Sequence, residues 1–135
     1  MLLDVIIIAS GAKTANLDRA YASVGPLAEK YTRVEPEEVV AAIKNSEADW
    51  IMLLYDNEWI DDHVRSSLPT FLLSSEYNFF LIFKKVRVNG ALRHYEAPRI
   101  FKRGVEINSK DFTPSIMQPH TLILDGWVLE EDRDG

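Results

Sequence analysis

Two carboxylates and an amide stand directly after an apolar run in the segment DWIMLLYDNEWI, residues 49–60. If the chain stays extended there, Asp56 and Glu58 occupy positions i and i+2, so both side chains could face one cation. Mg²⁺ and Mn²⁺ prefer oxygen ligands and commonly join one or two carboxylates to substrate phosphates. Asp56, Asn57 and Glu58 are also typical of a strand-to-helix turn, so both interpretations stay open.

The first apolar run of the chain ends in SGAKT, residues 10–14, which resembles the end of a phosphate-binding P-loop. The upstream glycine that the P-loop spacing requires is missing, because position 7 is Ile, and we therefore reject a P-loop. The segment remains a loop of small residues whose backbone amides could meet a nucleotide. The three histidines are scattered and have no cysteine partner, so the sequence does not predict a zinc site.

Charge is distributed unevenly along the chain. The formal net charge is -6, which argues against a surface that binds nucleic acid as a whole. Between Lys84 and Arg103, however, seven Lys or Arg residues stand against the single acid Glu96. Such asymmetry is typical of a face that meets an anion. The same basic residues could instead protect a solvated β-ribbon from pairing at its edge.

The composition limits the class of protein. The chain has 135 residues, 47% of them hydrophobic, and no cysteine, which predicts a single globular domain over residues 1–135 without disulfides or thiolate metal sites. The apolar runs fall far short of the roughly 20 residues that a membrane-spanning helix needs. The opening MLLDVIIIAS carries Asp4 and lacks a basic start, so we do not interpret it as a signal peptide. We therefore expect a cytoplasmic protein without a membrane span.

The candidate residues need a scaffold, and the apolar periodicity predicts one. Residues 2–10 and 49–55 are nearly continuous apolar runs, typical of parallel strands that are buried on both faces, and residues 29–35 predict a weaker strand between them. Helices are expected in three segments where apolar residues recur three or four positions apart, at residues 16–24, 36–46 and 59–68. This alternating order predicts a parallel sheet with helices packed on it.

The second half of the chain is mostly extended. Strands are expected in three segments, at residues 77–91, 98–107 and 120–130. Asn89-Gly90 is the strongest turn signal in the sequence and predicts a hairpin. The expected fold class is therefore α/β, with a parallel β-α-β-α-β start, helices packed on the sheet, and an extension by antiparallel strands.

Taken in this order, four segments resemble pieces of the small lipopolysaccharide core-type transferases, which are inverting glycosyltransferases of family 2 with the GT-A fold. The segments are DVIIIAS at residues 4–10, ADWIMLLYDNEWI at 48–60, PRIFKR at 98–103 and QPHTLILDG at 118–126. The resemblance implies a GT-A-like sheet of the nucleotide-diphospho-sugar transferase type. It also implies binding of a nucleotide-diphosphate sugar, aided by Mg²⁺ or Mn²⁺, and transfer of the sugar to the hydroxyl of an acceptor whose identity is unknown.

The resemblance assigns residues to the donor side of such a site. Ala9 and Ser10, in the loop after the first strand, would approach the nucleotide together with Asp56. Residues 55–58 stand in place of the metal-binding D-x-D motif of the family, so the metal ligands would be Asp56, Asn57 and Glu58. The diphosphate would be contacted by Arg99 and Lys102.

The resemblance also implies a base that deprotonates the acceptor hydroxyl, and the candidates are Glu58 and Glu131. The chain departs from the family pattern at three places. After the second expected strand, only Glu35 stands where the family has an aspartate. Aligned on Glu58, the metal-side aspartates of the family's DADE sequence fall on Tyr55 and Asn57. Thr121 stands where the family has Glu after the histidine.

A second class of function remains open, a non-catalytic interaction module of α/β fold whose basic segment 84–103 binds an anionic partner. The two classes differ in the direction of the basic side chains. A transferase needs Arg99 and some of its neighbours to converge on a pocket beside Asp56. An interaction module could spread them over an outer face.

Overall fold

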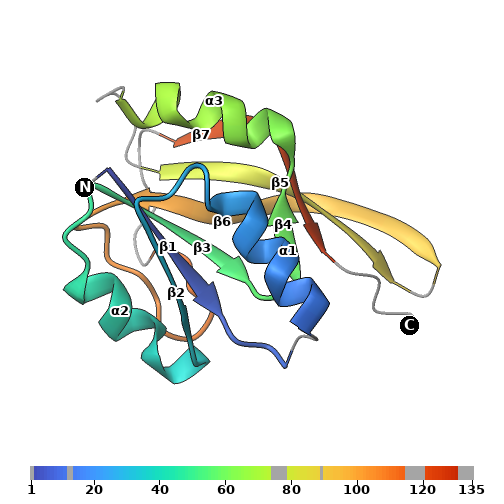
Figure 1. Cartoon of the computed structure of the whole chain (residues 1–135). Coiled ribbons are helices and arrows are strands. Elements are labelled where there is room, and N and C mark those ends of the chain that lie inside the picture. Colours follow the sequence, from blue (N-terminus) through green and yellow to red (C-terminus); the bar gives the residue numbers. More distant parts are fainter. Residues whose placement is uncertain (1, 12–13, 74–78, 89, 115–120, 131–135) are drawn as a thin grey trace.

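The computed structural model describes residues 2–11, 14–73, 79–88, 90–114 and 121–130, with the backbone alone at residues 87, 88, 95 and 121–130. Figure 1 shows the arrangement of these residues. The strands form one mixed sheet in the order β2-β1-β3-β6-β5-β7-β4. Because the order is not sequential, residues from both halves of the chain meet in the middle of the sheet.

The first half of the chain is a parallel β-α-β-α-β unit. The central strand β1 (Leu3–Ile8) pairs in parallel with β2 (Lys30–Val34) on one side and with β3 (Trp50–Tyr55) on the other. The connections are α1 (Thr14–Val24), then a 3₁₀ turn η1 (Pro36–Glu38) that leads into α2 (Val39–Asn45). β1 is buried along its whole length, whereas β2 is a mostly exposed strand at the edge of the sheet.

A long hairpin extends this sheet. β5 (Phe79–Val88) and β6 (Ala91–Lys102) are antiparallel, and β6 is also antiparallel to β3. Gly90 in the hairpin turn has a φ of 76°, a conformation that glycine adopts without steric cost. The predicted α/β fold with a parallel start and an antiparallel extension is confirmed.

One pair within the extension is parallel. β7 (Thr121–Glu130) runs alongside β5 in the same direction. A parallel neighbour requires a long connection, and the segment 103–120 between β6 and β7 provides one. The carboxyl ends of β1, β2, β3, β5 and β7 therefore all point the same way.

The segment after β3 differs from expectation, because Glu58–Ile60 form a short strand, β4, that pairs antiparallel with β7. The helix expected from residue 59 begins later, as α3 (Asp62–Leu73). The Asp61 carboxylate accepts a hydrogen bond from the Val64 backbone amide (2.9 Å), which is the contact of a helix N-cap. Ile60 still packs in the same core cluster as Val64, so the expected apolar face is kept.

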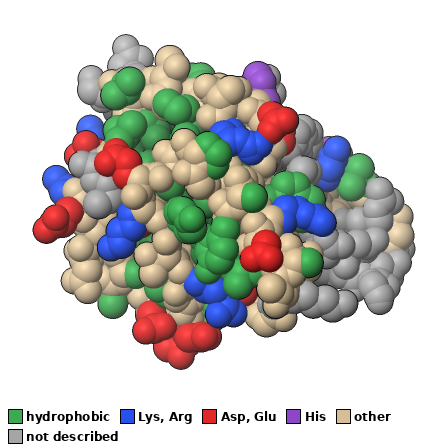
Figure 2. Space-filling model, viewed as in Figure 1, with side chains coloured by type: hydrophobic (Ala, Val, Ile, Leu, Met, Phe, Trp, Pro, Cys, Tyr) green, Lys and Arg blue, Asp and Glu red, His purple; other side chains and the backbone are tan. Residues whose placement is uncertain are grey.

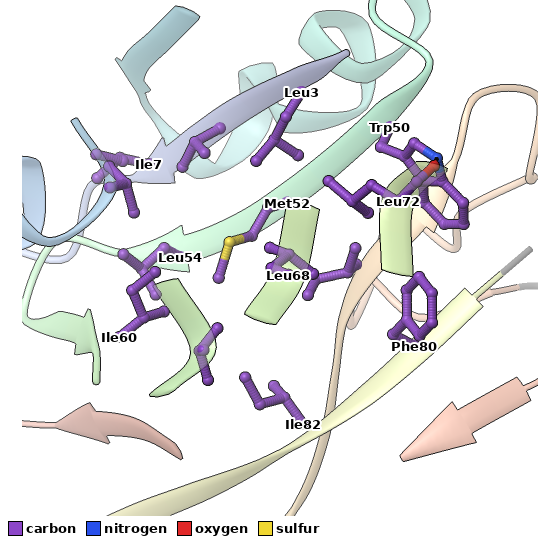
Figure 3. Packing of buried hydrophobic residues seen from close by; sticks show 14 of the residues in the cluster. Leu3, Ile7, Trp50, Met52, Leu54, Ile60, Leu68, Leu72, Phe80 and Ile82 are labelled. Carbon is purple, nitrogen blue, oxygen red and sulfur yellow. Dashed lines mark hydrogen bonds between the residues drawn. The ribbon is translucent and has the colours of Figure 1, made fainter. Parts of the chain in front are cut away.

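The apolar core lies on both faces of the sheet. On one face, β1 and β3 pack against α1 and α3; Figure 3 shows this cluster, in which Trp50 Nε1 donates to the Leu72 carbonyl oxygen (2.9 Å). On the other face, Ile6 and Ile8 pack with Val39 of α2. Successive residues of β1 alternate between the two clusters, which explains why its sequence is continuously apolar.

The surface mixes charges of both signs. Figure 2 shows that, on the side seen in Figure 1, basic and acidic side chains are interspersed with apolar and neutral groups. Among the described residues on this side, the basic side chains thus do not form one continuous field. In the part of the chain that the structure describes, no helix is long and apolar enough to cross a membrane.

Candidate functional site

Parallel pairing of β1 with β3 brings together the loops that follow these strands. Ile8 and Tyr55, the last residues of the two strands, are register partners, and the Asp56 amide donates to the Ile8 carbonyl oxygen (3.0 Å). The Ala9 amide donates to the Val34 carbonyl oxygen of β2 (2.8 Å). The polar residues after each strand therefore meet at the edge of the sheet where α/β proteins bind ligands.

Asp56 fastens the loop after β1. Its Oδ2 accepts hydrogen bonds from the Ser10 amide (3.0 Å) and from Nε and Nη2 of Arg33 (3.3 and 3.2 Å), and its Oδ1 accepts one from the Ser10 hydroxyl. Burial raises the pKa of Asp56, but the hydrogen bonds from Ser10, and then the hydrogen bond and charge of Arg33, outweigh burial and hold the pKa below its ordinary value. Asp56 is therefore an ionised anchor that fixes Ser10 in place.

Glu58 lies at the centre of a buried ionic cluster. Arg99 of β6 contacts it with both terminal nitrogens, Nη1 to Oε1 at 2.7 Å and Nη2 to Oε2 at 2.9 Å, and Lys84 of β5 pairs with Oε2. The Tyr55 amide also donates to Oε1 (2.7 Å). Burial raises the pKa of Glu58, but the charges of Arg99 and Lys84 and their hydrogen bonds outweigh burial and lower the pKa. Glu58 is held in its charged form.

The alternation of β5 explains why Lys84 is buried. Side chains at every second position of this strand point into the protein, at Phe80, Ile82, Lys84 and Val86. Lys84 thus occupies a position where an apolar residue is expected. Lys84 Nζ lies 5.9 Å and Arg99 Cζ 5.3 Å from the centre of the Tyr55 ring, so an aromatic face adds to the carboxylate in holding the two cations.

A cavity of about 600 Å³ opens beside the ionic cluster. Its polar lining includes Ser10, Asn57, Lys84 and Arg99, and Tyr55 lies among them. The volume falls within the range of about 300–1,000 Å³ that is typical of small-molecule sites. The cavity therefore combines hydroxyl and amide groups from one half of the chain with cations from the other.

A turn at residues 108–113 forms another side of the cavity, which Asp111, Phe112 and Thr113 line. Phe112 has a φ of 58°, a left-handed conformation that is rare for a bulky residue. The Thr113 hydroxyl donates to Asp111 Oδ1 (2.7 Å), and this hydrogen bond lowers the pKa of Asp111. The turn thus places an ionised carboxylate on the cavity wall.

The structure brings most of the predicted site residues together. Ser10, Asn57 and Arg99 line the cavity, and three buried residues adjoin them, Ala9, Asp56 and Glu58. Lys102 is not brought to the site, because it pairs with Trp50, the first residue of β3, whereas the cavity is lined by Leu53 and Tyr55 at the other end of that strand. Glu131 lies outside the described residues.

Of the three residues expected to bind a metal, the two carboxylates, Asp56 and Glu58, are held by different parts of the protein. The chain turns at Asp56 and Asn57 instead of staying extended, and Asp56 bonds to the β1 loop and β2 whereas Glu58 bonds to β5 and β6. Both oxygens of each carboxylate already accept donors from the protein. Within the described ranges, no group of three His, Cys, Asp or Glu residues could hold a metal ion. The residues in this arrangement therefore do not fit Mg²⁺ or Mn²⁺.

Sequence reasoning missed Arg33 and the turn at residues 108–113. Arg33 could have been found, because it lies near the carboxyl end of β2 and the carboxyl ends of parallel strands share one edge. Lys84 belongs to the basic segment that the sequence singles out, and its charge at an inward position of an apolar strand is a further signal in itself. The turn carries no comparable signal in the sequence.

The chain matches no model of a known protein family and no curated protein. The resemblance to family 2 glycosyltransferases thus rests on the segments quoted from the sequence.

Proposed function

We propose that the chain binds a nucleoside-diphosphate sugar in the cavity at the carboxyl ends of β1 and β3. The observation that carries the proposal is the convergence of Lys84 and Arg99, from two strands, on a cavity that Ser10 and Asn57 also line. Guanidinium and ammonium groups are the side chains that bind phosphate oxygens best. A diphosphate flanked by a nucleoside and a sugar matches a cavity with cations on one wall and neutral polar groups on another.

The direction of the basic side chains favours this function over the interaction module. Lys84 and Arg99 are buried and line the cavity, whereas Arg93 and Arg103 are exposed. A nucleotide-sugar site requires such convergence. An interaction module would need the exposed members of the basic segment to carry the binding, and it remains the alternative that the experiment below tests.

Different residues of the cavity are expected to bind different parts of the ligand. Ser10 and Asn57 offer a hydroxyl and an amide to the nucleoside, while Lys84 and Arg99 bind the diphosphate. Asp56 is fully buried and bonded to Ser10, so we assign it a positioning role rather than a direct contact with the ligand.

The resemblance further implies that the bound sugar is transferred to an acceptor hydroxyl. In that reaction the bond from the sugar C1 to the diphosphate breaks, a bond from C1 to the acceptor oxygen forms, and the hydroxyl proton passes to a base. Lys84 and Arg99 would stabilise the leaving diphosphate electrostatically. Glu58 is poorly placed to be the base, because it is fully buried and its oxygens contact Arg99, Lys84 and the Tyr55 amide.

The proposal is tested by calorimetric titration of UDP and GDP into the wild-type protein, Lys84→Met and Lys102→Met. We expect one nucleotide to bind and Lys84→Met to weaken it roughly tenfold to hundredfold, because a charged hydrogen bond is lost. Lys102→Met is the matched control, since it removes the same charge at the opposite end of β3. The proposal fails if neither nucleotide binds at millimolar concentration. Equal weakening in both variants would instead favour the exposed basic segment as the binding surface.

A further inference from the structure

We propose that this site holds the diphosphate with the protein's own cations, Lys84 and Arg99, and takes no divalent metal ion. The inference rests on the proposed function, because it concerns how the same cavity neutralises its ligand. The glycosyltransferases that the sequence resembles imply Mg²⁺ or Mn²⁺ at residues 55–58, yet the carboxylates there are engaged by other groups.

Asp56 is engaged on the side of β1 and β2. Its Oδ1 accepts the Ser10 hydroxyl, and its Oδ2 accepts the Ser10 amide and the Arg33 guanidinium. A metal ion at Asp56 would have to displace Arg33 or Ser10. Displacing Ser10 would release the loop after β1, which itself lines the cavity. Asp56 therefore has a structural role, because it holds the loop after β1 in place at the cavity.

Glu58 is engaged on the opposite side, by β5 and β6. Both of its oxygens contact cations, because Arg99 reaches each of them and Lys84 reaches Oε2. A divalent ion bound to Glu58 would lie next to a guanidinium and an ammonium group in a buried region. Repulsion between like charges is strong there, because water screens it poorly. The cluster thus opposes a metal ion at the position where the family motif would hold one.

The same contacts orient the Arg99 guanidinium so that it can bind an anion. The two-point contact with Glu58 fixes the plane of the guanidinium, which carries more N–H donors than Glu58 accepts. Glu58 is itself held by the Tyr55 amide and by the pairing of β4 with β7. The cation is therefore oriented before any ligand arrives, and little ordering is needed on binding. Glu58 is in this respect a positioning residue for Arg99.

The inference predicts that metal does not assist nucleotide binding. UDP and GDP are titrated by calorimetry in excess EDTA and in millimolar Mn²⁺. The nucleotide that binds is expected to bind at least as tightly in EDTA, because Mn²⁺ that coordinates the diphosphate in solution competes with Lys84 and Arg99. In EDTA, Lys84→Met is expected to weaken binding roughly tenfold or more, while the contact of Glu58 with Arg99 is retained.

A second readout uses the metal alone. Titration of Mn²⁺ followed by electron paramagnetic resonance, without nucleotide, is expected to be the same for wild type and Asp56→Asn. Nucleotide binding that requires Mn²⁺, or Mn²⁺ binding that Asp56→Asn abolishes, would overturn the inference and leave the proposed function standing. Failure of both nucleotides to bind in either buffer would overturn both.

Discussion

Arg99 and Glu58 form a buried two-point ion pair that links β6 to β4, two strands separated in the sheet by β5 and β7. Lys84 joins this pair from β5. The cluster thus connects the hairpin of the second half to the turn that follows β3. Because the same three side chains hold strands together and shape the cavity, changes in them affect both stability and binding.

Glu58→Gln is expected to destabilise the protein strongly. The amide leaves Arg99 and Lys84 buried without their carboxylate, and breaking a buried ion pair in this way costs about 3–5 kcal/mol. Urea denaturation measures the loss. Asp62→Asn is the control, because Asp62 pairs with Arg65 but its side chain is 98% exposed, and exposed pairs contribute little. Equal losses in the two variants would contradict the structural role of the buried cluster.

The free energy of unfolding should depend on acid pH in a defined direction. The ordinary pKa values of Asp56 and Glu58 are 3.8 and 4.5, and both are lowered in the folded protein. The unfolded chain therefore binds more protons in this range, so stability is present above these values and is lost as pH falls through the lower folded pKa values. Denaturation across a pH series measures the loss. In Asp56→Asn, the free energy of unfolding should depend less on pH than in the wild-type protein. A wild-type stability that rises on acidification would contradict the cited shifts.

Trp50→Phe should destabilise the contact between β3 and the end of α3. The substitution keeps an aromatic ring beside Phe80 but removes the Nε1 donor of the Leu72 carbonyl oxygen. Leaving a buried acceptor without its donor costs about 1–3 kcal/mol. Chemical denaturation measures the cost, with Trp59→Phe as the same substitution at a half-buried site. A larger effect at Trp59 would show that the hydrogen bond of Trp50 matters little.

Thr113→Val should raise the pKa of Asp111 toward its ordinary value. The Thr113 hydroxyl is the main group that lowers this pKa, through its hydrogen bond to Oδ1. The carboxyl carbon of Asp111 can be followed by NMR as a function of pH in both proteins. An unchanged titration would mean that the turn beside the cavity does not hold Asp111 as described.

Most of the fold could be predicted from the sequence, because its main strands and turns are each specified by a short contiguous stretch of residues. The continuous apolar runs predicted β1 and β3, and Asn89-Gly90 predicted the hairpin of β5 and β6. β4 was missed because a three-residue strand is defined by its partner β7 rather than by its own pattern. The parallel placement of β7 depends in the same way on the path of the chain.

The site was partly predictable because topology places the ends of parallel strands together. Ser10 and Asp56 could be expected to meet on this ground, and they do. Lys102 could not be separated from Arg99 by residue type, because both are basic residues of one strand. What separates them is the register, which places Lys102 opposite Trp50 at the far end of β3. The partners of Asp56 and Glu58 could not be predicted either, since they come from five different segments of the chain.

The most direct test of the account is to map nucleotide binding by the amide NMR spectrum of the labelled protein, with UDP or GDP added in excess EDTA. A nucleotide bound in the cavity is expected to shift the amide signals of the cavity wall, at Ser10, Asn57 and Thr113, while the signals near Arg93 at the hairpin end stay unchanged. Shifts confined to the exposed residues of the basic segment, or no shifts with either nucleotide, would contradict a nucleotide site at this edge of the sheet.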